Sequence, residues 1–525
     1  MTARFPILTF LAAAGLFFAA SVASGADSFG AARFNLWLAL GLAFALNPLK
    51  LRGKALAAWG LCGLVGALAG LILPAHIAGV WLFAAFLLTG AIFAKTAADN
   101  GADESGGDTL IILAAGFFNL SLITNTAHTD IQYDFASCFN YIEYILENNF
   151  LFWNENPLLN RPSYSAYHPI LHFLLAAGEI RLAQAAGADM RTAAEAVQVC
   201  FCFYMLWYYF LAGRILRLCG LTGSVRQAAL AFVCFFPAYN AIAGFFNNDC
   251  LLLPLQAGTV YYALLYYHNG GRKNLLWCGI FATAAALTKL SGVLVLPMVA
   301  TALFLRWRKA GYGRRIWTEL AVFAGLLAGG LAIWPLYQHF RLGVGADFVP
   351  PQTHLSLAGY GLWERFNPFG AFFYENRYYN DFGVNLWETM TKTALFGQWD
   401  FSMRGADILP LITALELFYK LLLAATWGAT AYFAGGFIFG KKMTAETGLM
   451  LVLLGGLLAG QILFGLRHPF MCNQDFRYVA LTALPIALLT AQLAAALPAG
   501  LKRTLTGLMA AFGVAAATVW WRISF

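Results

Sequence analysis

The feature that most constrains this chain is the recurrence of apolar runs long enough to cross a lipid bilayer. We count about fifteen runs of roughly 17–25 residues, the length at which a helix spans the hydrocarbon core. Hydrophobic residues make up 60% of the chain and charged residues 11%, a composition that excludes an ordinary soluble domain. The sequence therefore predicts an all-α polytopic membrane protein of about 15 transmembrane helices. The runs lie near 6–24, 33–49, 55–73, 78–94, 109–125, 193–213, 226–246, 250–267, 275–289, 291–306, 317–338, 409–438, 447–466, 478–497 and 503–521.

Clusters of cationic residues in the short loops predict the orientation of these helices. Counting the spans places all of the clusters on one side, which the positive-inside rule makes cytoplasmic. The N-terminus is then cytoplasmic, and the two longest loops, about 126–192 and 339–407, are extracytoplasmic. The net charge of +8 comes largely from the cationic cytoplasmic loops, which are also attracted to anionic membrane lipids. No nucleic-acid partner is needed to explain it. The clusters are Lys50, Arg52 and Lys54; Arg214 and Arg217; Arg272 and Lys273; Arg306, Arg308, Lys309, Arg314 and Arg315; Lys441 and Lys442; and Lys502 and Arg503.

The chain divides into two parts by the placement of its polar residues. Residues 1–108 hold about four closely spaced spans and end in a polar linker rich in Gly and Ala. Arg4, the first apolar run and the small residues up to Ala23 resemble a signal peptide, but the run is long enough to remain as a span. Polar chemistry gathers in 109–525, so we expect the functional site in that second part.

Two carboxylates follow the fifth apolar run, at Asp130 and Asp134. Thr129 and Gln132 have capping-box spacing, so a helix is expected to start here with both carboxylates on one face. The free N–H groups of a helix start would keep Asp130 ionised, and an ionised aspartate at a membrane surface is a candidate general base. A helix N-terminus that simply favours acidic residues explains the motif equally well.

The rest of the first outward loop predicts two helices lying in the membrane interface. Apolar residues from Phe135 to Leu146 recur at helical spacing, with polar residues on the other faces. A second apolar helix is expected to open at Tyr167-His168-Pro169-Ile170 and to end near Gly187. His168 and His172 are four residues apart, but no third ligand accompanies them, so a hydrogen-bonding role for His168 is the better reading.

Further polar residues fall at the outward ends of later spans. Asn247-Asn248-Asp249 lies between two apolar runs, and Asp475-Phe476-Arg477-Tyr478 lies in a late outward turn. Lys289 is a single cation on the outward side, against the positive-inside trend, and is well placed to bind a phosphate. Each residue alone reads as an interfacial anchor or a solvated turn, but together they put carboxylates, amides and cations on one face.

The 339–407 loop combines aromatic rings with amides and carboxylates. Such a mixture suits a sugar, because it offers apolar stacking beside hydrogen bonds. An interfacial aromatic belt is the alternative. The residues are Tyr360, Trp363, Tyr374, Tyr378, Tyr379, Trp387 and Trp399, with Asn367, Asn376, Asn380 and Asp381.

In their order and sidedness these motifs resemble the membrane glycosyltransferases of the C-type fold, in the branch of the protein O-mannosyltransferases and aminoarabinose transferases (glycosyltransferase family 39-like). The resemblance covers about residues 109–490. It departs from the family's pattern at Ile131, where the family has a second acidic residue, and at Ile170, where it has a second proline. The matching motifs are Asp130 with Tyr133, His168-Pro169-Ile170, Asn248-Asp249, Thr288-Lys289 and Arg477-Tyr478.

The resemblance implies an enzyme that moves a sugar from a polyprenyl-phosphate donor to an acceptor hydroxyl on the extracytoplasmic face. Asp130 would be the base, with Asp134 assisting, and direct displacement by one base predicts inversion at the anomeric carbon. Lys289, Arg477 and Tyr478 would bind the donor phosphate. The residues expected to contact the substrates are Tyr133, His168, Asn248, Asp249 and Asp475.

Several properties stay open at this point. The acceptor is a lipid, a glycan or a protein; no metal ligands are assigned and no cofactor is certain, although a divalent metal is an alternative. The expected location is the inner (plasma) membrane of a bacterium. The competing function is a polytopic transporter or flippase of lipid-linked sugars, which would place polar groups at mid-depth rather than at one face.

Overall fold

The computed structural model describes most of the chain from residue 135 onward and a few positions before it. The predicted spans that start at residues 6, 33, 55 and 78, most of the span at 109–125, and the residues Asp130, Tyr133 and Asp134 lie outside the described residues. The division of the chain at residue 108 therefore stays a prediction. The described ranges are 107–108, 111–112, 114–116, 118–119, 135–149, 164–185, 187–311, 314–337, 339–340, 355–373, 383–397, 408–439 and 443–524.

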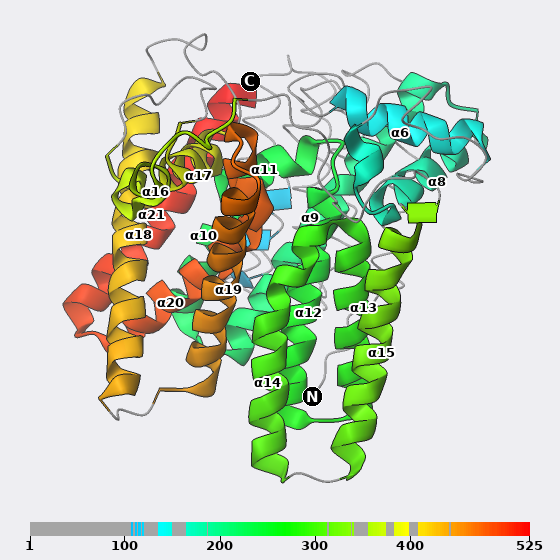
Figure 1. The fold of residues 1–525 in the computed structure, drawn as a ribbon. Helices are drawn as coiled ribbons and strands as arrows, with labels where there is room; N and C mark the ends of the chain where they lie inside the picture. The colour runs from blue at the N-terminus through cyan, green and yellow to red at the C-terminus, as the bar shows by residue number, and fades with distance from the viewer. Residues whose placement is uncertain are drawn as a thin grey trace, which may run out of the picture.

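The described part is built from helices, with one isolated bridge between Ser356 and Phe470. Long helices form an upright bundle, and short helices gather at its upper end (Figure 1). The α-helices are α6 Phe135–Glu147, α8 Leu171–Ala185, α9 Met190–Leu218, α10 Gly223–Cys234, α11 Pro237–Gly244, α12 Asp249–Asn269, α13 Arg272–Thr288, α14 Leu296–Ala310, α15 Arg314–Tyr337, α16 Leu362–Phe366, α17 Leu386–Phe396, α18 Leu409–Ile438, α19 Ala445–Arg467, α20 Ala483–Ala496 and α21 Ala499–Ser524. The 3-10 helices are η1 Tyr164–Tyr167, η2 Leu290–Val295, η4 Pro368–Ala371, η6 Met471–Gln474 and η7 Phe476–Thr482.

Six helical segments of the described part are long and apolar enough to cross a membrane, or seven if the bent pair α10 and α11 counts as one span. These seven fall on seven of the predicted runs. The runs at 193–213 and 503–521 lie within helices, and the run at 275–289 is helical up to Thr288, but those helices are outside this set. The chain is therefore a helical membrane protein, and the total of about fifteen spans stays a prediction.

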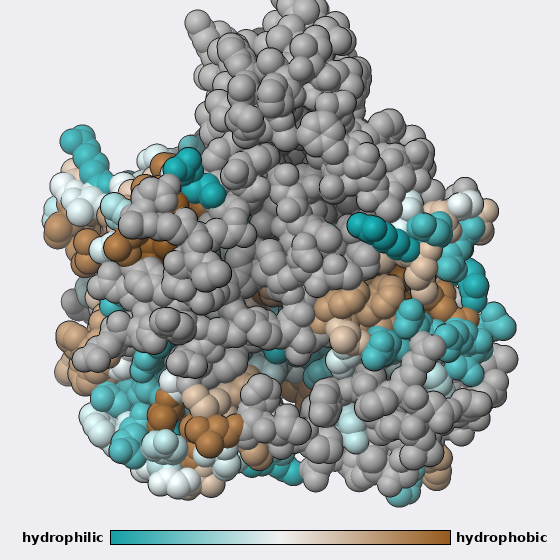
Figure 2. Space-filling view, turned by 90° about the horizontal axis from the view of Figure 1, so that it is seen from above, coloured by the Kyte–Doolittle hydropathy of each residue, from teal (hydrophilic) through white to brown (hydrophobic). Residues whose placement is uncertain are grey.

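The two ends of the bundle differ in chemistry. At the lower end, His268 Nε2 lies 3.4 Å from Glu446 Oε1, so the basic α12–α13 turn meets the start of α19. The end of α14 with the start of α15, and the end of α18 with the start of α19, lie at the same lower end (Figure 1). The short helices α6, α8, α16 and α17 lie at the upper end. Figure 2 looks onto this upper end, where hydrophilic and apolar side chains are mixed at the rim.

The helices α6 and α8 are the two helices expected in the first outward loop, and they pack on each other. Tyr141 of α6 packs on Phe173 of α8 at 5.0 Å between ring centroids, and Arg181 of α8 donates to the carbonyl of Leu146 at 2.7 Å. The expected start of the second helix is wrong. Residues Tyr164–Tyr167 form a 3-10 turn, with His168 N–H donating to the Ser165 carbonyl, so α8 begins only at Leu171.

Candidate active site

The site is built around the N-terminus of α12. Asn248 is the N-cap residue, Asp249 is the first helical residue, and the Asp249 N–H donates to Asn247 Oδ1 at 2.8 Å. An acidic residue is favoured here because the unpaired N–H groups of a helix start attract negative charge. All three side chains are buried, with Asp249 only 1% exposed. The Asn-Asn-Asp sequence therefore forms a buried polar turn rather than a solvated one.

Lys289 reaches this turn from the end of α13. Its extended backbone ends that helix, and η2 begins at the next residue. Gly292 makes this tight reversal possible, because a Cβ there would overlap the Ala285 carbonyl. Asn248 Nδ2 donates to the Thr288 carbonyl at 3.1 Å, which joins the two turns.

Lys289 and Asp249 form a buried ion pair with 2.6 Å between Nζ and Oδ1. Lys289 is 6% exposed, so it is not the solitary outward cation that its sequence suggests. One of its three N–H donors is used by Asp249. Asp249 Oδ2 has no hydrogen-bond partner among the described residues, so one oxygen of the carboxylate remains available to a substrate.

Arg477 and Tyr478 enter from the start of η7, and Asp475 caps that helix. Asp475 Oδ1 accepts from the Arg477 N–H at 2.9 Å, and Asp475 Oδ2 lies 3.6 Å from Arg477 Nε. The turn is held from α17, where the Thr393 hydroxyl accepts from the Phe476 N–H at 2.8 Å. Asp475 is thus placed to orient Arg477 rather than to face solvent, since it is 4% exposed.

The ring of Tyr478 brings the two cations together. Lys289 Nζ lies 4.8 Å from the ring centroid, and the Arg477 guanidinium carbon lies 5.6 Å from the same centroid. Both distances are within the range of a cation–π contact. The two cations are 188 positions apart in the sequence, yet both lie near one ring, and we call Lys289, Arg477 and Tyr478 the cation platform. Asp249 pairs with Lys289 and Asp475 with Arg477.

The first outward loop meets this site through aromatic contacts. His172 Nδ1 of α8 lies 4.0 Å from Cys250 Sγ, the residue after Asp249. Burial lowers the pKa of His172 to about 3, so the ring is neutral. His168 is half-buried one turn earlier. The start of α8 thus lies beside the start of α12.

The start of α6 lies close to the same turn. The rings of Phe135 and Phe246 are 6.0 Å apart, edge to face. Phe135 directly follows Asp134, and Phe246 directly precedes Asn247. No group of three metal-ligating side chains occurs in the part of the chain that the structure describes.

In the loop 339–407, two of the predicted sugar-binding groups have structural partners. Asn367 Oδ1 accepts from the Phe369 N–H and caps η4, while Trp387 Nε1 donates to the Phe366 carbonyl at 2.9 Å. Trp363 and Tyr360 are exposed.

The supporting roles of Thr393 and Gly292 were not expected. The Ser-Gly pair after Lys289 could have signalled the tight turn, whereas nothing in the sequence links Thr393 to Phe476.

Comparison with protein-family models finds no match, and neither does comparison with curated proteins. Among solved structures, the chain is similar to the crystal structure of ArnT from Cupriavidus metallidurans bound to undecaprenyl phosphate. The match covers 79% of this chain and 76% of that chain, with 13% sequence identity and a TM-score of 0.45. A likeness of this degree carries no argument about what this chain binds, so the function has to be argued from its own residues.

Proposed function

We propose that this protein transfers a sugar from a polyprenyl-phosphate donor to an acceptor hydroxyl on the extracytoplasmic side of a membrane, with inversion. The observation that carries the proposal is the convergence of Lys289 and Arg477 on the ring of Tyr478. Two cations gathered at one end of a charge-poor bundle form a site for an anion at the membrane surface. A phosphate that leaves as a polyprenyl phosphate is stabilised by such cations and needs no general acid.

The two carboxylates that pair with the cations fix the positions of the Lys289 and Arg477 side chains. Asp249 and Asp475 neutralise the cluster formally, so it is no simple positive patch. A preorganised ion pair presents its remaining N–H donors in a fixed direction, which favours the charge that develops on the leaving phosphate. The free oxygen of Asp249 adds an acceptor for a sugar hydroxyl.

The base of the reaction is Asp130, with Asp134 orienting it or the acceptor. The support is the position of Phe135, whose contact with Phe246 brings the start of α6 to the Asn247–Asp249 turn. Asp134 is the residue before Phe135 in the sequence. The order of the motifs resembles that of the C-type-fold branch of the protein O-mannosyltransferases and aminoarabinose transferases.

The proposal is tested by transfer in proteoliposomes that contain the purified protein and a radiolabelled polyprenyl-phosphate sugar. Arg477→Ala should reduce the rate about tenfold to a hundredfold, because it removes a charge-assisted contact of about 1.5–3 kcal/mol. Arg467→Ala is the matched control, since Arg467 is an exposed cation at the end of α19 and lies outside the cluster. Equal rates in the two variants would reject the phosphate site.

A further inference from the structure

The turn between α12 and α13, at the lower end of the bundle, carries cations without carboxylate partners (Figure 1). Arg272 and Lys273 are the first two residues of α13, and both are exposed. Neither forms an ion pair with a carboxylate in the part of the chain that the structure describes. They lie at the opposite end of α13 from Lys289, so they are separate from the cation platform.

The positions of these two cations on α13 are unfavourable without an anion. The start of a helix carries a partial positive charge, which favours acidic residues and disfavours basic ones. The first turn of α13 contains no acidic residue, and its N-cap residue is Gly271, which has no side chain to accept a hydrogen bond. An anion at this turn would therefore offset both the helix dipole and the charges of Arg272 and Lys273.

A third cation reaches the same turn from α14. The guanidinium of Arg306 lies across Gly270, where a Cβ would be 2.6 Å from Nη2. Gly270 also has a positive φ of 67°, so both its backbone and the close approach of Arg306 require glycine. Arg306 Nη1 makes one long hydrogen bond, of 3.5 Å, to the His268 carbonyl. The guanidinium is thus held over the turn with further N–H donors available.

Two carboxylates approach this end of α12, and both engage α12 itself. Glu446 Oε1 lies 3.4 Å from His268 Nε2. Glu319 is buried and accepts from the Tyr266 hydroxyl at 2.5 Å. Neither carboxylate forms an ion pair with the three cations of the turn. The turn therefore presents a positive surface at the membrane boundary.

The exposed face of α13 changes from charged to apolar within about one turn. Leu276 and Ile280 follow Arg272 at intervals of four residues, and Trp277 follows Lys273 at the same interval, so all five share one face. The three apolar side chains are 42%, 39% and 37% exposed, in that order. Each helical turn rises about 5.4 Å, so these side chains lie closer to the centre of the bilayer than the cations do. Cations at the membrane surface with apolar side chains beneath them are complementary to a phospholipid.

We propose that Arg272, Lys273 and Arg306 bind the phosphate of an anionic phospholipid. Its acyl chains lie along the exposed face that begins at Leu276. The two guanidinium groups can each donate parallel N–H bonds to phosphate oxygens, which an ammonium cannot do. Unpaired cations select an anionic headgroup, and the apolar face selects a ligand that carries hydrocarbon. The site lies away from the proposed sugar-transfer site and does not depend on that function.

The start of α21 provides a matched comparison. Lys502 and Arg503 are likewise exposed near the start of a helix. The residues four positions later are Thr506 and Gly507, neither of which has a large apolar side chain. Gly500 has open space around it, so no third cation lies over it. The same two charges are therefore present at α21 without the apolar face and without the arginine from a neighbouring helix.

The test is native mass spectrometry of the purified protein in detergent, with added phosphatidylglycerol or phosphatidylcholine of the same acyl chains. Wild-type protein should bind phosphatidylglycerol more tightly. Arg272→Gln with Lys273→Gln should weaken that binding roughly thirtyfold, at about fivefold per cation, and leave phosphatidylcholine binding unchanged. The control variant, Lys502→Gln with Arg503→Gln, removes the same charge and should bind phosphatidylglycerol as the wild type does.

Two further measurements identify the source of the phosphate. Dihexanoyl phosphatidylglycerol has the same headgroup on short chains, and it should bind at least about tenfold more weakly, since each buried methylene contributes about fourfold. Inorganic phosphate should not displace the long-chain lipid. Equal weakening in the two double variants would reduce the effect to general charge attraction and overturn the site. Equal binding of both headgroups, or displacement by inorganic phosphate, would overturn the assignment of an anionic phospholipid.

Discussion

Lys289 Nζ and Asp249 Oδ1 lie 2.6 Å apart in a site where the two residues are 6% and 1% exposed. The residues are 40 positions apart, at the end of one helix and the start of another. A buried pair of this kind contributes little net stability, but the loss of one partner leaves an uncompensated charge. The Lys289–Asp249 pair therefore affects two properties: the stability of the two turns that it joins, and the charge that these turns present to a substrate.

This link gives a prediction for the pair. Lys289→Ala should destabilise the protein by about 3–5 kcal/mol, because the Asp249 carboxylate stays buried without its partner. The double variant Lys289→Ala with Asp249→Asn should recover most of the thermal stability but not the transfer rate. Thermal unfolding in detergent and the transfer assay check both parts. Recovery of wild-type transfer by the double variant would remove Lys289 from the phosphate site.

The ring of Tyr478 should matter more than its hydroxyl. Two cations lie near its centroid, and a cation–π contact contributes about 0.5–2 kcal/mol. We expect Tyr478→Phe to transfer at close to the wild-type rate and Tyr478→Leu to lose roughly threefold to thirtyfold. Steady-state rates at saturating donor measure the difference. A larger loss in Tyr478→Phe than in Tyr478→Leu would assign the role to the hydroxyl instead.

Asp130→Asn preserves size and hydrogen bonding but cannot take a proton. If Asp130 is the base, the variant should lose at least about a hundredfold in rate with donor binding nearly intact. Asp134→Asn should cost less unless a metal is held there, and added chelator separates those cases. A near-normal rate in Asp130→Asn together with an inactive Asp134→Asn would move the base role to Asp134.

The orientation of the bundle is tested by labelling single cysteines with a membrane-impermeant thiol reagent. Ser356→Cys and Glu147→Cys, both exposed positions in the two long loops, should react from outside the cell. Thr504→Cys, exposed near the start of α21 at a basic turn, should react only after permeabilisation. Cys472 must first be replaced by Ser, because it is a partly exposed free thiol at the outer end. The opposite pattern would invert the topology and reject the proposed enzyme.

Glu179 of α8 should make stability depend on pH. Burial raises the pKa of its carboxyl from 4.5 to about 7, against a smaller opposing effect of the Tyr204 hydroxyl, which donates to it at 2.9 Å. The folded state therefore binds more protons than the unfolded state between these pKa values, so this group lowers stability as pH rises from about 4.5 to 7. Glu179→Gln should stabilise the protein by on the order of 2 kcal/mol at pH 8 and little at pH 4. Equal unfolding temperatures for variant and wild type at pH 8 would contradict this account.

Much of the described fold follows from the sequence because bilayer-spanning helices depend on long local patterns. The run predicted at 409–438 is α18 with the same bounds. The start of α8 was misplaced, since the 3-10 turn at Tyr164–Tyr167 depends on hydrogen bonds to Ser137 of α6 rather than on local spacing.

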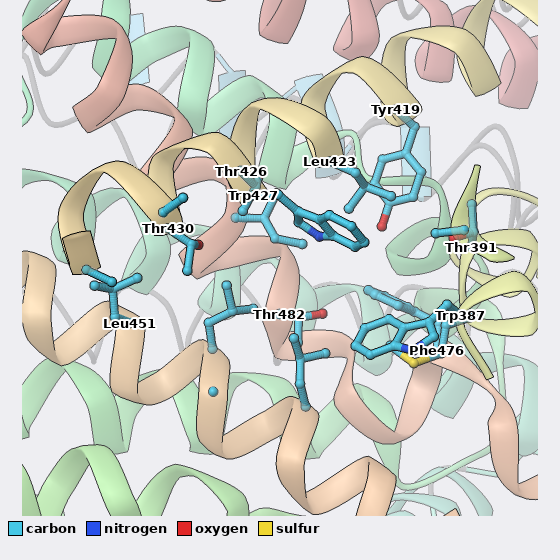
Figure 3. A pocket seen from close by; sticks show the side chains of 18 residues that line it. Trp387, Thr391, Tyr419, Leu423, Thr426, Trp427, Thr430, Leu451, Phe476 and Thr482 are labelled. Carbon is cyan, nitrogen blue, oxygen red and sulfur yellow. The ribbon is translucent and has the colours of Figure 1, made fainter. Parts of the chain in front are cut away.

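The residues of the site were easier to predict than their pairing. Lys289, Asp249 and Arg477 stand out because charges are rare at the ends of apolar runs. Their contacts depend on how distant turns meet, and no local pattern encodes that. The apolar cavity lined by α17, α18, α19 and the segment η7–α20 (Figure 3) was not predicted for the same reason.

The central claim is that the bond between sugar and polyprenyl phosphate is broken at the Lys289–Arg477 site. The most direct measurement follows a donor labelled in both the sugar and the lipid, in proteoliposomes of the wild-type protein. The account predicts that free polyprenyl phosphate and transferred sugar appear in equal amounts, and that both fall together in Arg477→Ala. Movement of intact donor across the bilayer without release of polyprenyl phosphate would contradict it and identify a flippase instead.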